Sequence, residues 1–445
     1  CGSKRISKKI IVASSGKIES LDPARANTLK AIQLISSLGD TLYELNSNGE
    51  LIPELASGMP IISKDRLHIT INLRKNVFFH DGTSFNSNAI KFTFDRFKRI
   101  GTMNYILGNK IKSIETPSEY SVIINLNKPS SSINGLLTSV NLTPISPTFY
   151  QEYSDKFLNE KFVGTGKYVL SSFSNEVQSI DPNLNYWGEK PLNKGINFVG
   201  YSNSSSLFGA LKSKQIDVLL SNSIDDSQRK SLNNLSKNKQ FKEGNSPFTE
   251  LSFISLKTSS YPLNNLNLRL ALAKSLNRKL ISEKVSYGLR KPSRSIIPPI
   301  LKKDNQALWP KYDYLEARRL LQNENYCNGN ILKIPLTYRS NVPADKLIAL
   351  TWQQEIKNSL KDCINIELNG VESTTVYKNL SLGIYTAVIL DWTGAYSDPE
   401  AYLTPLLSCN EIVDGICKKG ESVYSGSFWG SNKVETLFLE SEKIS

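Results

Sequence analysis

The 445-residue sequence predicts a mixed α/β fold with more than one domain. Segments that alternate apolar and polar residues, as strands do, are interspersed with segments of helical period, and hairpins are mixed with at least one strand–helix–strand unit. At about 150 residues per domain, the length favours two or three domains. Hydrophobic residues make up 39% of the chain, which is enough for sizeable cores. No apolar run approaches the ~18 residues that span a bilayer.

The first half of the chain alternates short strands with helices. Leu67–Leu73 and Tyr120–Leu126 have apolar residues at every second position, which is typical of strands with one buried face. Between them, Ile90, Phe94 and Phe97 share one helical face. The strands expected here are 9–12, 67–73, 120–126, one opening at the 164–168 turn, and 216–220; the helices are about 28–43, 89–97 (capped by Asn86 or Ser87) and 204–212.

The second half contains a strand–helix–strand unit. Ile331–Tyr338 and Ile364–Leu368 are its strands, and the helix between them can start at Pro343. Its apolar stripe consists of Ile348, Trp352, Ile356 and Leu360. The two strands of such a unit are parallel neighbours. Further helices are expected at about 268–277 and 314–321, and a further strand at 385–390.

Four cysteines besides Cys1 predict two disulfides if the protein is exported. Cys327 and Cys363 each precede a strand of the strand–helix–strand unit, so they lie at the same end of adjacent parallel strands. Cys409 and Cys417 are paired by proximity. Four cysteines allow three connectivities, and four reduced thiols are the alternative.

The N-terminus predicts a lipid anchor. Cys1-Gly2-Ser3 precedes a short basic, polar stretch, which resembles a mature bacterial lipoprotein after removal of its signal peptide. Cys1 would then carry the lipid, and residues 1–9 would be a lipid-anchored tether. The protein would lie on the periplasmic or cell-surface side of the bacterial membrane. An arbitrary start of the sequence is the alternative.

Charge and composition narrow the function classes. The formal net charge is +13, but the basic residues are scattered, so we expect a lysine-rich surface and no nucleic-acid partner. His68 and His80 are the only histidines, which excludes a multi-histidine metal site. The sequence contains no GxxxxGK[ST], no GxSxG and no GxGxxG after a strand. We therefore expect no catalytic residue, no metal and no cofactor.

One segment is suited to binding a small ligand. Residues 391–402 follow a predicted buried strand, and ligand sites of open sheets lie beyond the carboxyl ends of strands. Aromatic walls with a few placed charges suit small ligands. The segment supplies both kinds of group: Asp391, Trp392, Tyr396, Asp398, Glu400 and Tyr402. A surface turn with Trp392 in the core is the alternative.

A series of motifs resembles the extracytoplasmic solute-binding proteins of family 5, the oligopeptide, dipeptide and nickel type that serves ABC importers. In the strongest motif, the strand 67–73 ends in Leu73-Arg74, and the Phe79-His80-Asp81-Gly82 turn leads into a helix. The further matches occur in family order and cover nearly the whole chain: Gly164-Thr165-Gly166, Tyr186-Trp187-Gly188, Lys214–Asp217, Leu268–Ala273, Tyr312 with Ala317, and Trp392 with Asp398-Pro399.

The resemblance implies a two-lobed periplasmic-binding-protein-like fold of the class II type, with a third subdomain inserted in the first lobe. A ligand would be enclosed between the lobes, which close by hinge motion. The second lobe ends earlier than in the family, so we expect it to lack its C-terminal end; the alternatives are a truncated sequence, a missing partner segment, or a member of the family that closes differently. The implied ranges are 10–45 and 161–254 for the first lobe, 46–160 for the inserted subdomain and 255–445 for the second lobe.

The resemblance also bears on the ligand. Peptide-binding members carry an Asp in the loop after the Trp that pairs with the peptide's amino group, and Ala395 stands there. Nickel-type members carry a His where this chain has Glu400. Dipeptide-type members carry an Arg that meets a carboxylate, and Arg339 stands at about that place, with a surface arginine as the alternative.

The resulting hypothesis is a monomeric, lipid-anchored binding protein that captures a small solute, a peptide or peptide-like compound first of all, and passes it to an ABC permease. The expected ligand-binding residues are Trp392, Tyr396 and Tyr402 as walls, Asp391, Asp398 and Arg339 for ligand charges, and Asn27 and Thr28 from the other lobe. The alternatives are a metal chelate, a sugar or an amino-acid derivative as solute, or a sensor or chaperone role on the same scaffold. An enzyme is disfavoured because no catalytic triad is apparent.

Overall fold

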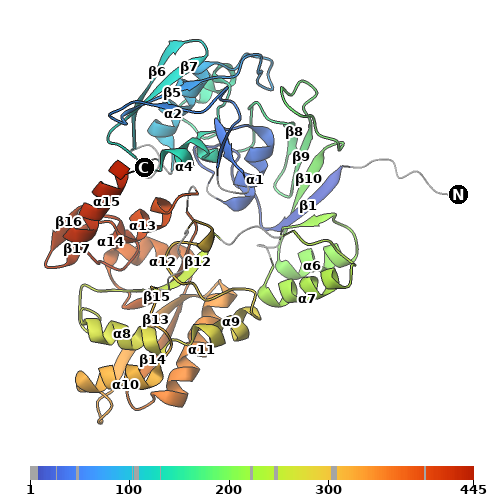
Figure 1. Ribbon diagram of the computed structural model, residues 1–445. Coiled ribbons are helices and arrows are strands. Elements are labelled where there is room, and N and C mark those ends of the chain that lie inside the picture. Colours follow the sequence, from blue (N-terminus) through green and yellow to red (C-terminus); the bar gives the residue numbers. More distant parts are fainter. Residues whose placement is uncertain are drawn as a thin grey trace. The chain divides into compact units, whose positions relative to one another are not determined.

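The computed structural model describes residues 9–444 except 27, 47–49, 103, 105–109, 131, 221–223, 245–248, 302–307 and 395–396. The chain divides into two compact units (Figure 1). Unit 1 consists of residues 1–224 with 442–445, and unit 2 consists of residues 225–441. None of the helices in the described ranges is both long and apolar enough to cross a membrane.

Unit 1 contains a five-stranded mixed sheet in the order β11-β1-β10-β9-β8. β1 pairs in parallel with β10 and β11, whereas β8, β9 and β10 form antiparallel pairs. The strands are β1 (Ile10–Ser15), β8 (Tyr168–Phe173), β9 (Val177–Pro182), β10 (Ile196–Tyr201) and β11 (Val218–Leu219). α1 (Leu29–Leu38) buries its apolar face in the core of this sheet, and α6 (Ser204–Lys212) contacts β1, β10 and β11.

Helix α1 is shorter than the expected 28–43. Thr28 is its N-cap, with a side chain that accepts a hydrogen bond from the backbone N–H of Ala31, and Gly39 is its C-cap. Gly39 adopts an extended conformation, and a Cβ there would lie 2.5 Å from Thr143 Cγ2. Because glycine is poor in a helix and this close approach needs a glycine, the helix stops where the chain passes Thr143.

A second, antiparallel sheet of unit 1 has the order β4-β5-β7-β6. α2 (Ser87–Ile100) packs against it through contacts with β6 and β7, and Asn86 caps this helix as the sequence indicates. The strands are β4 (Ile61–Ile62), β5 (His68–Asn72), β6 (Ile111–Ser118) and β7 (Ser121–Leu126). The remaining elements of this part are β2 (Tyr43–Leu45), β3 (Leu51–Pro53), α4 (Ile133–Leu137), η2 (Val140–Leu142), α5 (Pro147–Tyr150) and η3 (Gln151–Tyr153).

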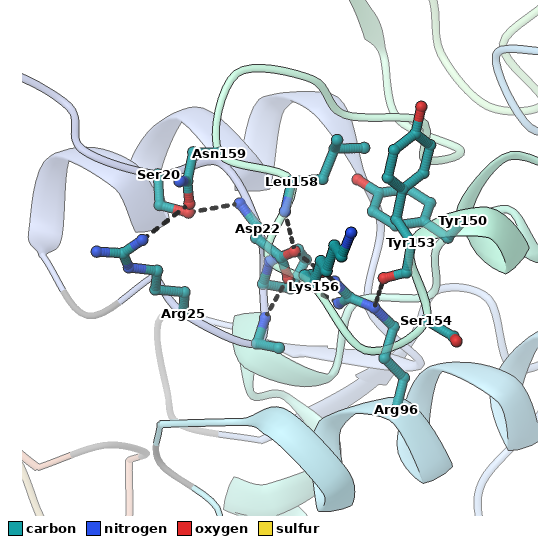
Figure 2. Close-up of polar contacts among 12 residues, drawn as sticks. Ser20, Asp22, Arg25, Arg96, Tyr150, Tyr153, Ser154, Lys156, Leu158 and Asn159 are labelled. Atoms are coloured by element: carbon teal, nitrogen blue, oxygen red, sulfur yellow. Dashed lines mark hydrogen bonds and ion pairs between the residues drawn. The ribbon is translucent and has the colours of Figure 1, made fainter.

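A buried ion pair connects α2 to the segment that precedes α1 (Figure 2). Arg96 Nη1 and Nη2 donate to the two carboxylate oxygens of Asp22, at 2.8 and 2.6 Å. Arg96 Nη2 also donates to the carbonyl of Lys156, and the N–H of Leu158 donates to Asp22 Oδ2. Three segments far apart in sequence therefore meet at one pair of side chains.

Unit 2 is built on a four-stranded sheet in the order β12-β15-β13-β14. β13 pairs in parallel with both β14 and β15, and β12 is antiparallel to β15. The strands are β12 (Leu251–Leu256), β13 (Leu332–Arg339), β14 (Ile364–Val371) and β15 (Ala387–Trp392). The parallel pairing of β13 and β14 confirms the predicted strand–helix–strand unit.

The helix of this unit, α11 (Pro343–Ser359), packs against β13 and β14 through Trp352 and Ile356. Cys327 and Cys363 form a disulfide beside the amino ends of these strands, and Cys409 and Cys417 form a second one. These are the pairs that the sequence predicted. The other elements of unit 2 are α7 (Asp226–Lys237), α8 (Leu266–Ser275), α9 (Arg278–Ser286), η5 (Pro299–Leu301), α10 (Tyr314–Asn323), α12 (Ser373–Asn379), η6 (Leu380–Leu382), α13 (Glu400–Leu407), β16 (Glu411–Val413), β17 (Ile416–Lys419) and α14 (Glu421–Tyr424); α15 (Asn432–Ile444) follows.

The division into units differs from the expected lobe ranges at residues 225–254, which include α7, and at residues 442–445, which belong to unit 1. The sequence assigned 161–254 to the first lobe, but α7 lies in unit 2, where it packs against α9. Arg290 of the segment after α9 also pairs with Asp226 of α7. Tertiary contacts of this kind cannot be predicted from the local pattern of apolar and polar residues.

Candidate functional site

The candidate site lies at the carboxyl edge of the unit 2 sheet. β13, β14 and β15 run parallel, so their carboxyl ends meet at one edge. Ligands of open sheets bind outside this edge. Arg339 is the last residue of β13 and Trp392 the last residue of β15, so the two strands deliver a cation and an aromatic ring to the same edge.

Arg339 is the centre of a hydrogen-bond network. Its Nε donates to Asp345 Oδ2 at 2.7 Å, and its Nη2 donates to Asp345 Oδ1 at 3.1 Å. Its Nη1 donates to Asp391 Oδ1 at 2.8 Å and to the hydroxyl oxygen of Tyr377 at 2.7 Å. The Tyr377 hydroxyl in turn donates to Asp391 Oδ1 at 3.1 Å. Four residues from four elements, β13, α11, α12 and β15, are thereby joined.

Burial differs sharply within this network. Arg339 is 4% exposed and Asp345 only 1%. The side chain of Asp391 is 37% exposed, and Tyr377 is 46% exposed. Asp391 and Tyr377 are therefore the members that can reach a solute, whereas Arg339 and Asp345 lie beneath them.

Electrostatics keep the guanidinium charged. Burial alone lowers the pKa of Arg339, but the hydrogen bonds and charges of Asp345 and Asp391 outweigh it, so the net shift of the pKa is upward. Burial raises the pKa of Asp345, and the two bonds from Arg339 oppose that shift. Burial also raises the pKa of Tyr377, to about 12, so its hydroxyl stays protonated and can donate.

Trp392 and the loop after it are tied to α13. Trp392 is half-buried, and its Nε1 donates to the carbonyl of Ala401 at 2.8 Å. Asp398 Oδ1 accepts from the N–H of Glu400, so Asp398 supports the first turn of α13. Glu400 Oε1 accepts from the Thr404 hydroxyl within the same helix.

Tyr402 was expected as a wall of the site, and the structure places its side chain in the interior of unit 2. The residue is 2% exposed, and its hydroxyl donates to the carbonyl of Thr249 at 2.7 Å. Its ring packs so closely against Gly394 that a Cβ on residue 394 would lie 2.7 Å from Cε2 of Tyr402. Tyr402 supports the loop from inside, because Ala401 and Tyr402 in the first turn of α13 are both buried.

The remaining expected residues fall elsewhere. Thr28 caps α1 in unit 1. Tyr396, with its neighbour Ala395, lies outside the described residues, as do Asn27 and the lipidation residue Cys1. In the portion of the chain that the structure describes, no group of three or more His, Cys, Asp or Glu side chains could hold a metal ion.

Sequence reasoning missed Asp345 and Tyr377. Asp345 lies in the first turn of the helix that follows β13, and Tyr377 lies in the helix that follows β14. Both helices start at the same edge of the sheet, because each follows a parallel strand. The two residues could have been predicted by looking for acidic or phenolic residues in the first two turns of each helix that follows a parallel strand.

Unit 1 has a comparable edge at the carboxyl ends of β1 and β10. A small hollow there is lined by polar residues that include Ser14, Lys17, Lys30 and Gln178. Lys30 Nζ donates to the carbonyls of Ser15 and Lys17, both at 2.8 Å, and burial lowers the pKa of this lysine. Lys30 thus holds the turn after β1.

Each unit thus places polar groups at the carboxyl ends of parallel strands, and unit 2 adds an aromatic ring there, which is an arrangement typical of proteins that bind small solutes. A sequence model described as bacterial extracellular solute-binding proteins, family 5 Middle, matches residues 50–414, which is most of the chain. The protein belongs to the bacterial extracellular solute-binding proteins of family 5.

Relatives and solved structures agree with this assignment. The glutathione-binding protein GsiB of Escherichia coli O6:K15:H31 is 26% identical over 442 residues, which cover 98% of this chain and 83% of the relative. The structure of DppA from Helicobacter pylori in complex with peptide STSA has a TM-score of 0.77 at 23% identity, covering 98% of this chain and 87% of that one. The structure of NikA from Brucella suis in complex with Fe(III)-EDTA has a TM-score of 0.82 at 20% identity, and the match covers 98% of this chain and 91% of that one. The fold is therefore that of the two-lobed periplasmic binding proteins.

Proposed function

We propose that the protein is the extracytoplasmic solute-binding component of an ABC importer, and that it captures a peptide or peptide-like solute for delivery to the membrane permease. It releases the solute without covalent change and acts as a monomer. Trp392, Asp391, Asp398, Arg339 and Tyr396 are the proposed ligand-binding residues of unit 2. Tyr402 supports them from the interior of the unit. Asn27 and Thr28 are the proposed contribution of unit 1.

One observation carries this proposal: a half-buried tryptophan and a partly exposed carboxylate lie at the carboxyl edge of three parallel strands. An apolar surface next to a few placed hydrogen-bonding groups is the usual make-up of a small-ligand site. The relatives support the peptide class, because one is named for glutathione and two solved structures hold peptide STSA and Met-Leu.

Mass spectrometry of ligand released from the native protein tests the proposal. The protein is purified without denaturant from its own host and then unfolded, and the released small molecules are identified. We expect a peptide or peptide-like compound of unchanged structure, and we expect it to raise the melting temperature when added back. A sugar or a metal chelate would contradict the peptide class. A covalently altered product would contradict the binding role.

We further propose that Cys1 carries a lipid and that the protein is anchored on the periplasmic or cell-surface side of the membrane. Mass spectrometry of the N-terminal peptide from native protein should show acyl groups on Cys1. A Cys1→Ala variant should then leave the membrane fraction while retaining its ligand. An unmodified native N-terminal cysteine would contradict the anchor and leave the binding proposal intact.

A further inference from the structure

Two Asn-Gly dipeptides of unit 2 lie in opposite structural settings. Asn-Gly dipeptides occur in the sequence at 48–49, 134–135, 328–329 and 369–370, and the structure describes the side chains of Asn328 and Asn369. Asn328 lies in the segment between α10 and β13, whereas Asn369 lies within β14. A glycine after an asparagine has no Cβ to shield its backbone nitrogen. This nitrogen is the nucleophile nearest to the side-chain amide of the asparagine.

The setting of Asn328 is open. Asn328 and Gly329 are both exposed, and the hydrogen bond that closes this turn runs from the N–H of Cys327 to the carbonyl of Asn330, at 2.9 Å. The Asn328 side chain and the Gly329 N–H have no hydrogen-bond partner among the residues that the structure describes. A Cβ on residue 329 would meet no atom within 4 Å, so the space around this glycine is open to solvent. The nitrogen and the amide carbon can therefore meet without loss of a bond that either group makes.

The setting of Asn369 is closed, although its side chain is also exposed. β14 pairs with β13 along its length, with Asn369 opposite Thr337 and Gly370 opposite Tyr338. Tyr338 lies so close to Gly370 that a Cβ on residue 370 would be 2.8 Å from the tyrosine hydroxyl oxygen. Attack on the side chain requires the following nitrogen to rotate out of the extended conformation of a strand. β14 must therefore open locally before Asn369 can react, and local opening costs free energy.

We propose that Asn328 is a site of spontaneous deamidation in the folded protein and that the strand protects Asn369. The Gly329 nitrogen gives up its proton to a base of the solvent and attacks Cγ of Asn328. A bond forms between this nitrogen and Cγ, the bond from Cγ to Nδ2 breaks, and ammonia leaves with a proton taken from solvent. Water then opens the succinimide ring at either of its two carbonyls, which leaves aspartate or isoaspartate at residue 328. The overall reaction consumes one water and releases one ammonia, without oxidation or reduction.

The modification changes unit 2 at a defined place. It adds a negative charge, and in the isoaspartate form it adds a methylene to the main chain before β13. Cys327 is held by its disulfide to Cys363, and the N–H of Leu332 donates to the Cys363 carbonyl at 2.8 Å, so both ends of the turn are fixed. The turn precedes the amino end of β13, whereas Arg339 is the last residue of that strand. This inference is therefore independent of the proposed function.

Mass spectrometry of protein aged in mildly alkaline buffer tests the proposal. The folded protein is incubated, samples are digested under acidic conditions, and fragmentation of the peptides locates each converted asparagine. We expect Asn328 to convert at least about tenfold faster than Asn369. In the reduced and alkylated chain in urea, where β14 is lost, we expect the two rates to agree within about threefold. Equal rates in the folded protein would overturn the proposal, and so would a difference of about tenfold that persists in urea.

Two glycine variants test the chemistry of the attack. Gly329→Ala should slow the conversion of Asn328 about tenfold or more, because a Cβ shields the attacking nitrogen. Gly288→Ala is the matched control and should leave this rate unchanged, since Gly329 and Gly288 both have a positive φ, of 85° and 79°, and open space around them. An unchanged rate in Gly329→Ala would overturn attack by this nitrogen. Thermal unfolding shows whether each variant folds; if Gly329→Ala does not, the comparison of folded and unfolded wild-type protein decides.

Discussion

Asp22 and Arg96 form a bidentate ion pair in which neither side chain is more than 1% exposed. The pair connects the segment before α1 to α2 and to the loop at 156–158 (Figure 2). Arg96 also lies over the ring of Tyr150, 5.3 Å from its centroid. A pair of this kind is costly to break from one side, because the remaining charge is left buried without a counterion.

We therefore predict a large loss of stability for Asp22→Ala. The expected loss in the free energy of unfolding is about 3–5 kcal/mol. Asp95→Ala is the control on the same helix, since Asp95 pairs with Lys91 but both side chains are more than two-fifths exposed. An exposed pair contributes about 0–1 kcal/mol. Urea unfolding of both variants measures the difference, and equal losses would contradict the prediction.

The buried carboxyl of Glu54 should make the free energy of unfolding depend on pH. Burial, followed by the charges of Asp40 and Glu44, raises the pKa of this carboxyl from 4.5 to about 7. Because the pKa is higher in the folded state than in the unfolded chain, the folded state holds the proton more tightly. The free energy of unfolding should therefore decrease as the pH rises from about 4.5 to about 7, and this contribution should level off above that range.

Replacing Glu54 by glutamine removes the titrating group and should flatten this part of the profile. Urea unfolding at about pH 5 and about pH 8 measures it, with Glu50→Gln as a control at an exposed position of the same hairpin. The difference in stability between the two pH values should shrink in Glu54→Gln and persist in Glu50→Gln. If both variants kept the wild-type difference, Glu54 would not be its source.

The two disulfides should contribute unequally. Cys327–Cys363 closes a loop with a sequence separation of 36, and Cys409–Cys417 one of only 8. Loop-closure entropy of the unfolded chain then predicts about 4 kcal/mol for the longer loop and about 2.5 kcal/mol for the shorter one. Denaturant unfolding of the two double Cys→Ala variants measures both values. A larger loss from the shorter loop would show that native-state contacts outweigh chain entropy here.

Trp392→Ala should weaken ligand binding without unfolding the protein. The half-buried ring at the end of β15 supplies apolar contact area, so we expect a loss of at least about tenfold in affinity by calorimetry. Trp392→Phe keeps a ring but loses the hydrogen bond to Ala401, which separates ring contact from loop support. Trp309→Ala is the control, because Trp309 is also partly exposed in unit 2. Unchanged affinity in Trp392→Ala would remove Trp392 from the site.

Local patterns predicted most elements of the core. The helix predicted from the apolar stripe after Pro343 corresponds to α11, and the helix predicted at 204–212 coincides with α6. β5 and β7, the two strands in which apolar and polar residues alternate, occupy nearly the predicted ranges. Side-chain periodicity identifies such elements, because it records which face of each segment is buried. The end of α1 was not predicted, since it depends on the approach of Thr143 to Gly39.

The sequence by itself determined the family, through short motifs that follow one another along the chain. It also determined the strand–helix–strand unit and pointed to the segment at 391–402 that carries Trp392, since each of these depends on residues close together in the chain. Only the tertiary structure decided which groups surround Arg339. Asp345, Tyr377 and Asp391 come from three different elements, and they meet because parallel strands bring their carboxyl ends to one edge. Whether an arginine is free for a ligand or neutralised by the protein depends on contacts across the fold, which no local pattern records.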